Sequence, residues 1–217
     1  VAYVCPVGGS DTTATQAAVA AGTWSSAVVM GAATTSSVSP VNGAMRDVML
    51  LARVITPEEW AAYKAGTKPT GSVVADWPLY PDWLDDSGNA NHLTSGGIAP
   101  TFNPIANYPC TRFGGKGYLT CATSASLQTL GAAGSFLCRM KFNEVLRLQR
   151  VIYGATAAQL TLLANGVFRV GANGSSYIYP TGTTALDANK WYDVLVTWQH
   201  PGTVYAYICP AGGSDST

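Results

Sequence analysis

The sequence predicts an all-β protein, a two-sheet antiparallel sandwich with one short helix. Segments with alternating apolar and polar residues recur along the 217 residues, and Thr, Ser, Tyr, Val and Gly are abundant. Only one segment carries clear signals for the start of a helix. A chain of this length can bury one substantial core without help from metals or disulfides. We therefore expect one sandwich and not two independent domains.

The most regular strand patterns lie in the second half of the chain. In 191–198, Tyr192, Val194 and Val196 fall on one face, and the β-branched run 203–209 after a Pro-Gly turn predicts a hairpin. In 135–142, apolar residues alternate with Arg139 and Lys141, which predicts a strand with one solvent-exposed face. The remaining predicted strands are 26–30, 44–51, 112–113, 118–121, 150–153, 159–163 and 167–170.

The one predicted helix begins directly after Thr56. Thr56 supplies a capping hydroxyl, Pro57 suits the first helical position, and Glu59 is able to reach back to the cap. Trp60 and Tyr63 are three residues apart and share one face of the helix. The helix is therefore expected to lie on the sandwich.

Ten residues near the N-terminus recur near the C-terminus. Residues 2–11 read AYVCPVGGSD, and residues 206–215 read AYICPAGGSD, a displacement of 204 positions. One explanation is that the chain spans one period of a tandem repeat and overlaps the next. The other is that either copy can fill one strand position in a neighbouring molecule, which would be a device for polymerisation.

Charge and hydropathy exclude two classes of partner. Twelve basic residues balance twelve acidic ones, and charged residues make up 11% of the chain, so nucleic acid is not expected as a ligand. There is no run of 18 apolar residues, so no membrane-spanning helix is expected. The composition is typical of an extracellular or particle-surface β-protein.

Several segments resemble motifs of LamG-like (laminin G-type) domains, which are concanavalin A-like jelly rolls. The segments 75–79 (ADWPL) and 84–92 (LDDSGNANH) resemble the opening of such a domain, 110–119 (CTRFGGKGYL) the next hairpin, and 190–198 (KWYDVLVTW) the central strand. The strand 43–50 and the helix at 56–63 resemble the elements that normally end the domain. Here they come first.

The order of these motifs implies a permuted domain. Residues 1–67 resemble the closing third of a LamG-like sandwich, residues 72–217 resemble the opening two thirds, and 68–71 has the composition of a linker. Together the segments amount to one domain, in cyclically permuted order or cut from a tandem repeat. The resemblance implies a concanavalin A-like jelly roll.

The sequence does not predict an enzyme. Glycoside hydrolases with related sandwiches need two carboxylates beside the sugar bond, commonly in a strand motif E-x-D-x-x-E, and this motif does not occur. Glu58 and Glu59 belong to the helix start, and Glu144 has no acidic residue near it in sequence. Neither His92 nor His200 lies near a nucleophile motif G-x-S-x-G.

Calcium is the one metal that the sequence suggests. Asp86 and Asn89 lie in a turn rich in side-chain oxygens, and the resemblance implies a structural calcium near this turn, with Asp47 from the matching closing strand as a further ligand. The alternative is that the side chains of the turn only bond to its backbone.

The cysteines leave two alternatives open. A hairpin that pairs Phe113 with Tyr118 sets Cys110 opposite Cys121, within reach of a disulfide. Otherwise the two are small apolar side chains that face the same core. Cys138 lies on the apolar face of its strand and is expected to be a buried free thiol.

One tryptophan is a candidate ligand platform. Trp83 lies in a turn-rich context, where an exposed ring can stack on a sugar. Trp77, Trp191 and Trp198 lie in strand motifs and are expected to pack in the core.

Two functions fit these observations. The first is a structural protein of an extracellular filament, surface layer or virus particle, whose LamG-like units bind copies of themselves or tandem neighbours. The second is an extracellular lectin-like LamG module that binds glycan or protein. The repeat and the low charge favour the first function, and the family resemblance favours the second.

Overall fold

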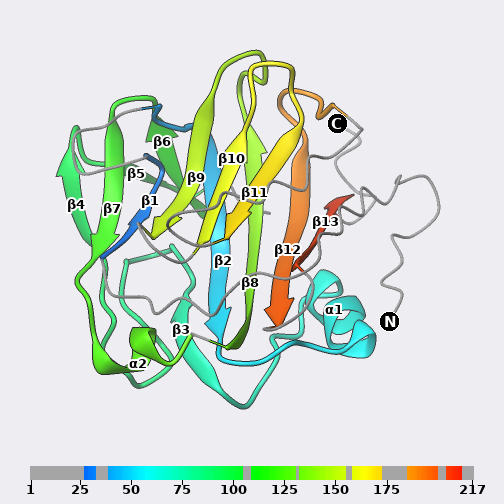
Figure 1. Cartoon of the computed structure of the whole chain (residues 1–217). Coiled ribbons are helices and arrows are strands. Elements are labelled where there is room, and N and C mark those ends of the chain that lie inside the picture. Colours follow the sequence, from blue (N-terminus) through cyan, green and yellow to red (C-terminus); the bar gives the residue numbers. More distant parts are fainter. Residues whose placement is uncertain are drawn as a thin grey trace.

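The computed structural model describes residues 27–32, 39–104, 109–130, 132–154, 158–172, 185–199 and 204–211. Within them, two antiparallel sheets pack face to face and two short helices lie at the periphery (Figure 1). This confirms the all-β two-sheet sandwich. The first copy of the repeated ten residues and the end of the second copy lie outside the described residues. Neither described helix is long and apolar enough to cross a membrane.

One sheet has seven strands. Its order is β13-β12-β8-β2-β6-β5, and β3 pairs with the second half of β2. The strands are β2 (Asn42–Leu51), β3 (Val73–Trp77), β5 (Thr101–Asn103), β6 (Cys110–Gly114), β8 (Ala133–Phe142), β12 (Trp191–Gln199) and β13 (Val204–Pro210).

The other sheet has six strands, in the order β11-β10-β9-β1-β7-β4. The strands are β1 (Val28–Met30), β4 (Thr94–Gly97), β7 (Gly117–Cys121), β9 (Gln149–Gly154), β10 (Ala158–Leu162) and β11 (Phe168–Ala172). Because β1 lies between β9 and β7 and β2 lies between β8 and β6, the part of the chain before residue 67 contributes to the middle of both sheets. One sandwich is therefore built from both parts of the chain.

The alternation predicted for β8 and β12 places their apolar side chains as expected. The solvent-exposed face predicted for β8 is wrong, because Leu137 on that face is fully buried and Arg139 and Lys141 are half-buried. Cys138 and Met140 of β8 enter the main core between the sheets, as do Val194 and Val196 of β12. The hairpin of β12 and β13 is confirmed, because the two strands pair from Tyr192 opposite Pro210 to Trp198 opposite Val204. Trp77, Trp191 and Trp198 are buried.

The predicted helix is α1 (Pro57–Lys64), and its capping box is complete. The Thr56 hydroxyl accepts the N–H of Glu59, and the Glu59 carboxylate accepts the N–H of Thr56. Trp60 and Tyr63 are buried, and their rings stack with centroids 5.8 Å apart. They form a second apolar cluster against the outer face of the seven-stranded sheet, so α1 covers this face.

The hairpin predicted for residues 112–121 is wrong. β6 belongs to the seven-stranded sheet, where it pairs with β2 and β5, and β7 belongs to the six-stranded sheet, where it pairs with β1 and β4. The glycine-rich turn between them therefore passes from one sheet to the other. A second short helix, α2 (Ala125–Gln128), follows β7 and was not predicted.

Candidate functional site

The turn that follows β3 is organised around the carboxylate of Asp85. Its Oδ1 accepts the backbone N–H groups of Asp76 and Ser87, at 2.9 and 3.0 Å. Its Oδ2 accepts the N–H of Asn91 and the hydroxyl of Ser87, at 2.9 and 2.8 Å. Asp85 is 7% exposed. This buried carboxylate is therefore satisfied by four hydrogen bonds, one from β3 and three from the turn itself.

Asn91 connects the same turn to α2 and to the core. Its Nδ2 donates to the Val74 carbonyl and to Ser126 Oγ, and its Oδ1 accepts the Ser124 hydroxyl at 2.6 Å. Its backbone carbonyl accepts the indole N–H of Trp77, also at 2.6 Å. These contacts fix the turn to β3, to α2 and to a buried tryptophan.

The three residues suggested as calcium ligands already have other contacts or point to solvent. The Asn89 Nδ2 donates to the carbonyls of Val73 and Val74 at 3.0 Å, and Asp86 is exposed. Asp47 Oδ2 lies 2.7 Å from the Nε of Arg46. In the described parts of the chain, no group of three or more His, Cys, Asp or Glu side chains is placed to share a metal ion. The contacts fit a turn that bonds to its own backbone, and calcium binding stays a prediction.

Trp83 belongs to an aromatic cluster at the edge of the seven-stranded sheet. Its indole N–H donates to Thr111 Oγ1 at 3.0 Å, and its ring centroid lies 5.1 Å from that of Phe102 in β5. Tyr80 meets Phe102 edge-on at 6.2 Å. Trp83 is half-buried, whereas Phe102 is 40% exposed. The exposed ring of this cluster is therefore Phe102, which the sequence did not indicate.

The disulfide suggested between Cys110 and Cys121 is wrong. Both are buried free thiols, because β6 and β7 are in different sheets and do not pair. They also do not share a core: Cys121 packs between the sheets, and Cys110 packs with Ala44 and Trp191 on the outer face of the seven-stranded sheet. Burial raises the pKa of Cys121 to about 11. Cys138 is a buried free thiol, as predicted, and Cys209 is disulfide-bonded.

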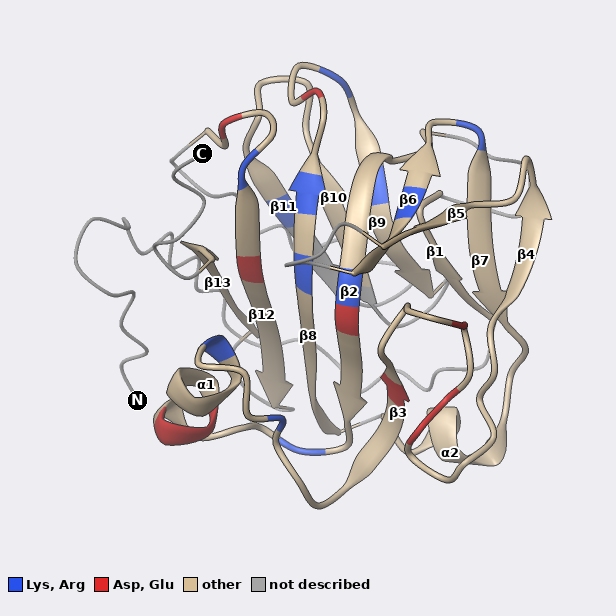
Figure 2. Cartoon of the chain, turned by 180° about the vertical axis from the view of Figure 1, so that it is seen from behind, with Lys and Arg blue, Asp and Glu red and all other residues tan. Residues whose placement is uncertain are grey.

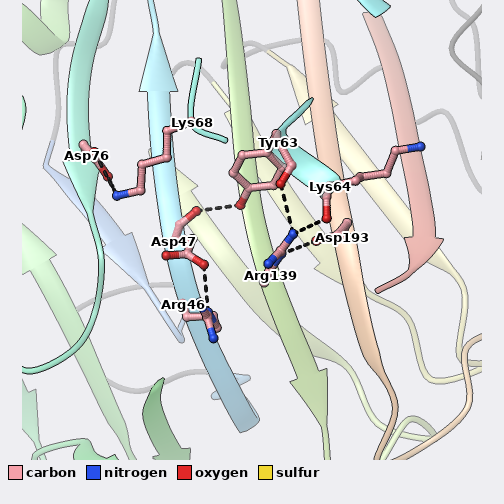
Figure 3. A network of polar contacts seen from close by, with 8 residues as sticks. All are labelled: Arg46, Asp47, Tyr63, Lys64, Lys68, Asp76, Arg139 and Asp193. Atoms are coloured by element: carbon pink, nitrogen blue, oxygen red, sulfur yellow. Dashed lines mark hydrogen bonds and ion pairs between the residues drawn. The ribbon is translucent and has the colours of Figure 1, made fainter. Parts of the chain in front are cut away.

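A polar network fixes α1 to the outer face of the seven-stranded sheet (Figure 3). Arg139 of β8 pairs with Asp193 of β12, with 2.6 Å between Nε and Oδ1. Its Nη2 donates to the carbonyls of Tyr63 and Lys64, in the last turn of the helix. The Tyr63 hydroxyl donates to the Asp47 carbonyl at 2.7 Å. A cation at a helix C-terminus satisfies carbonyls that have no partner within the helix and interacts favourably with the helix dipole.

Burial dominates the electrostatics of this network. The side chain of Asp193 has no exposed surface, and its Oδ2 has no hydrogen-bond partner. Burial raises the pKa of Asp193, although the nearby Arg139 opposes this shift. Burial likewise raises the pKa of Asp76, against the effect of Lys68, whose Nζ lies 2.7 Å from Oδ1. The buried pair of Arg139 and Asp193 thus anchors the C-terminal end of α1 to the sheet.

Comparisons of the chain with family models, with curated proteins and with solved structures give no match. The resemblance to LamG-like domains therefore rests on the sequence motifs.

Proposed function

We propose that this chain is a non-catalytic, LamG-like structural sandwich that self-associates in an extracellular filament, surface layer or virus particle. The association uses its duplicated strand sequence. The observation that carries this proposal is the place of β13, which ends the described order of the seven-stranded sheet and contains the first half of the second copy. Within one sandwich, the position beside β12 is filled by this copy.

The side chains of β13 pack into two apolar clusters, one on each face of the strand. Ala206 and Ile208 enter the main core, and Tyr207 and Cys209 enter the cluster under α1. The first copy reads Ala-Tyr-Val-Cys in 2–5 and so offers the same pattern, with Val in place of Ile. A strand with this pattern suits the position beside β12 of a second molecule, because register follows from which side chains enter the core. We infer that exchange of the two copies between molecules drives assembly.

The assembly proposal predicts that Val4→Lys abolishes association of the full chain. Val4 corresponds to Ile208, which is 7% exposed, and a lysine placed there in a neighbour would bury an unpaired charge. The fold should persist, because β13 fills the position within its own sandwich. Light scattering across a concentration series measures molar mass, and thermal melting reports the fold.

The matched control is Thr12→Lys, which adds the same charge outside the repeated residues and should assemble like the parent chain. Each sample is measured with and without reductant, because Cys209 is disulfide-bonded. A parent chain that stays monomeric at every concentration contradicts the proposal. So does a Val4→Lys chain that assembles normally.

Glycan binding is the second candidate, and the aromatic cluster favours it. Phe102 exposes its ring and packs against the rings of Trp83 and Tyr80. An exposed aromatic ring suits stacking on the apolar face of a sugar. Such a chain would act as an extracellular lectin-like module.

If glycan binding is right, Phe102→Ala should lower glycan affinity at least tenfold and change stability little, because Phe102 is exposed on the end strand of its sheet. The measurement is a glycan array with calcium present, followed by titration of any ligand found. Leu146→Ala removes another exposed apolar side chain far along the sequence and is the control. If Phe102→Ala and Leu146→Ala bind glycan with equal affinity, the aromatic cluster is not the glycan site.

A further inference from the structure

Two arginines and a threonine form one row across the six-stranded sheet. Thr161 of β10 pairs with Arg150 of β9 on one side and with Arg169 of β11 on the other. The neighbours Leu160, Leu162 and Phe168 enter the core, so the row faces outward. Two strand spacings separate the arginine backbones by about 10 Å. Both arginines are half-buried, and Thr161 between them is 2% exposed.

Neighbouring side chains of the six-stranded sheet hold the guanidinium of Arg150 in place. Its Nη1 donates to Gln159 Oε1 at 3.0 Å, and its Cζ lies 5.6 Å from the centroid of the Tyr153 ring. Its Nε is buried and has no hydrogen-bond partner. The edge that Nε shares with Nη2 is the one that takes a carboxylate or sulfate in a two-bond contact. Because buried N–H groups normally have a hydrogen-bond partner, the Arg150 Nε–H indicates a place for a ligand oxygen.

The charge of this sheet has one sign. The sequences of its six described strands contain Arg150 and Arg169 and no Asp or Glu. In Figure 2 the blue segments of this sheet lie on β9 and β11, and none of its strands is red. An anionic ligand at the row therefore meets attraction from both sides.

We propose that Arg150, Thr161 and Arg169 form a binding site for an oxyanion group, a sulfate or a carboxylate. Arg150 takes two oxygens through Nε and Nη2, the Thr161 hydroxyl donates to an oxygen between the strands, and Arg169 adds charge from the other side. This activity goes beyond the proposed assembly and uses none of its residues. The row lies on the opposite sheet from β13 and from Phe102.

The test follows the Arg150 Nε–Hε signal by NMR during titration with sodium sulfate, at an ionic strength kept constant with sodium chloride. The expected result is a saturable shift in the parent chain and at least a tenfold weaker affinity in Arg150→Gln, read from backbone signals of β10. Arg150→Lys keeps the charge and loses the two-bond edge, so an intermediate affinity is expected. Thermal melting shows that each variant is folded.

The control variant is Arg112→Gln, which removes an exposed arginine from the other sheet and should bind sulfate like the parent chain. Dextran sulfate and neutral dextran distinguish a sulfated polymer from free sulfate as the source of the group. If dextran sulfate retards the parent chain but not Arg150→Gln, the natural ligand is a sulfated polymer. If only free sulfate binds and its binding saturates, the ligand is a small anion. A shift that does not saturate, or equal affinity in Arg150→Gln and the parent, overturns the proposal.

Discussion

Replacement of Arg139 by methionine is expected to lower the free energy of unfolding by about 3–5 kcal/mol, the usual effect of removing one partner of a buried ion pair. Methionine fills much of the same volume, so the loss comes from charge. The fully buried Asp193 would keep a carboxylate without its ion-pair partner. The carbonyls of Tyr63 and Lys64 would lose their hydrogen bonds to the guanidinium at the same time, although the Tyr63 carbonyl keeps the N–H of Gly66. Urea unfolding followed by tryptophan fluorescence measures the change.

Two controls separate the buried charge from a general effect of arginine loss. Arg46→Met removes the neighbour of Arg139 in the same register row, but that residue and Asp47 are each 20% exposed, so a change of about 1 kcal/mol or less is expected. The double replacement of Arg139 by Met and Asp193 by Leu should recover much of the loss, because no charge stays buried. Equal losses for Arg139→Met and Arg46→Met would contradict this account.

The sequence was sufficient where the signal is local. The alternation in β8 and β12 follows from a side-chain period of two, and the start of α1 follows from a capping box between Thr56 and Glu59. Such signals need no knowledge of distant residues. They therefore predicted the sandwich, the C-terminal hairpin and the helix that covers one sheet.

Strand partners are not local, and here the prediction failed. β6 and β7 flank a short glycine-rich turn, which has the composition of a hairpin, yet they do not pair with each other. β6 pairs with β2 and β7 pairs with β1, and both of these partners lie far away in sequence. The side chains of Phe113 and Leu119 enter the same core from opposite sheets. The alternation of apolar and polar residues within β6 and β7 would be the same in a hairpin and in two opposite sheets. β4 and β5 were missed because Thr94–Gly97 and Thr101–Asn103 are too short to give a period.

The candidate sites show the same difference between local sequence signals and contacts that depend on strand pairing. The polar turn was found from its composition, but the sequence could not show that Asp85 is the buried carboxylate and Asp86 the exposed one. Arg139 and Asp193 are 54 positions apart and meet through the register of β8 with β12. Phe102 joins Trp83 because β5 pairs with β6 beside the turn. Pairs of this kind require the topology.

Asp85→Ala is expected to destabilise the protein by about 3 kcal/mol or more, because each buried N–H left without an acceptor costs about 1–3 kcal/mol. Its carboxylate serves the N–H groups of Asp76, Ser87 and Asn91 and the hydroxyl of Ser87. Loss of the Asn91 contact also loosens the segment that accepts the indole N–H of Trp77. Asp85→Asn keeps one acceptor oxygen, so roughly half of the loss is expected. Chemical unfolding provides both values.

Asp86→Ala is the matched control, because Asp86 is the exposed neighbour and its contact to the Asp76 carbonyl comes from its backbone N–H. A change within about 0.5 kcal/mol is expected, as for most surface substitutions. The measurement is repeated with calcium and with a chelator, since a cation held only by the folded state would stabilise it by mass action. If Asp86→Ala loses as much stability as Asp85→Ala, and only when calcium is present, the turn is a calcium site. Equal losses without calcium would contradict the assignment of Asp85 as the carboxylate that organises the turn.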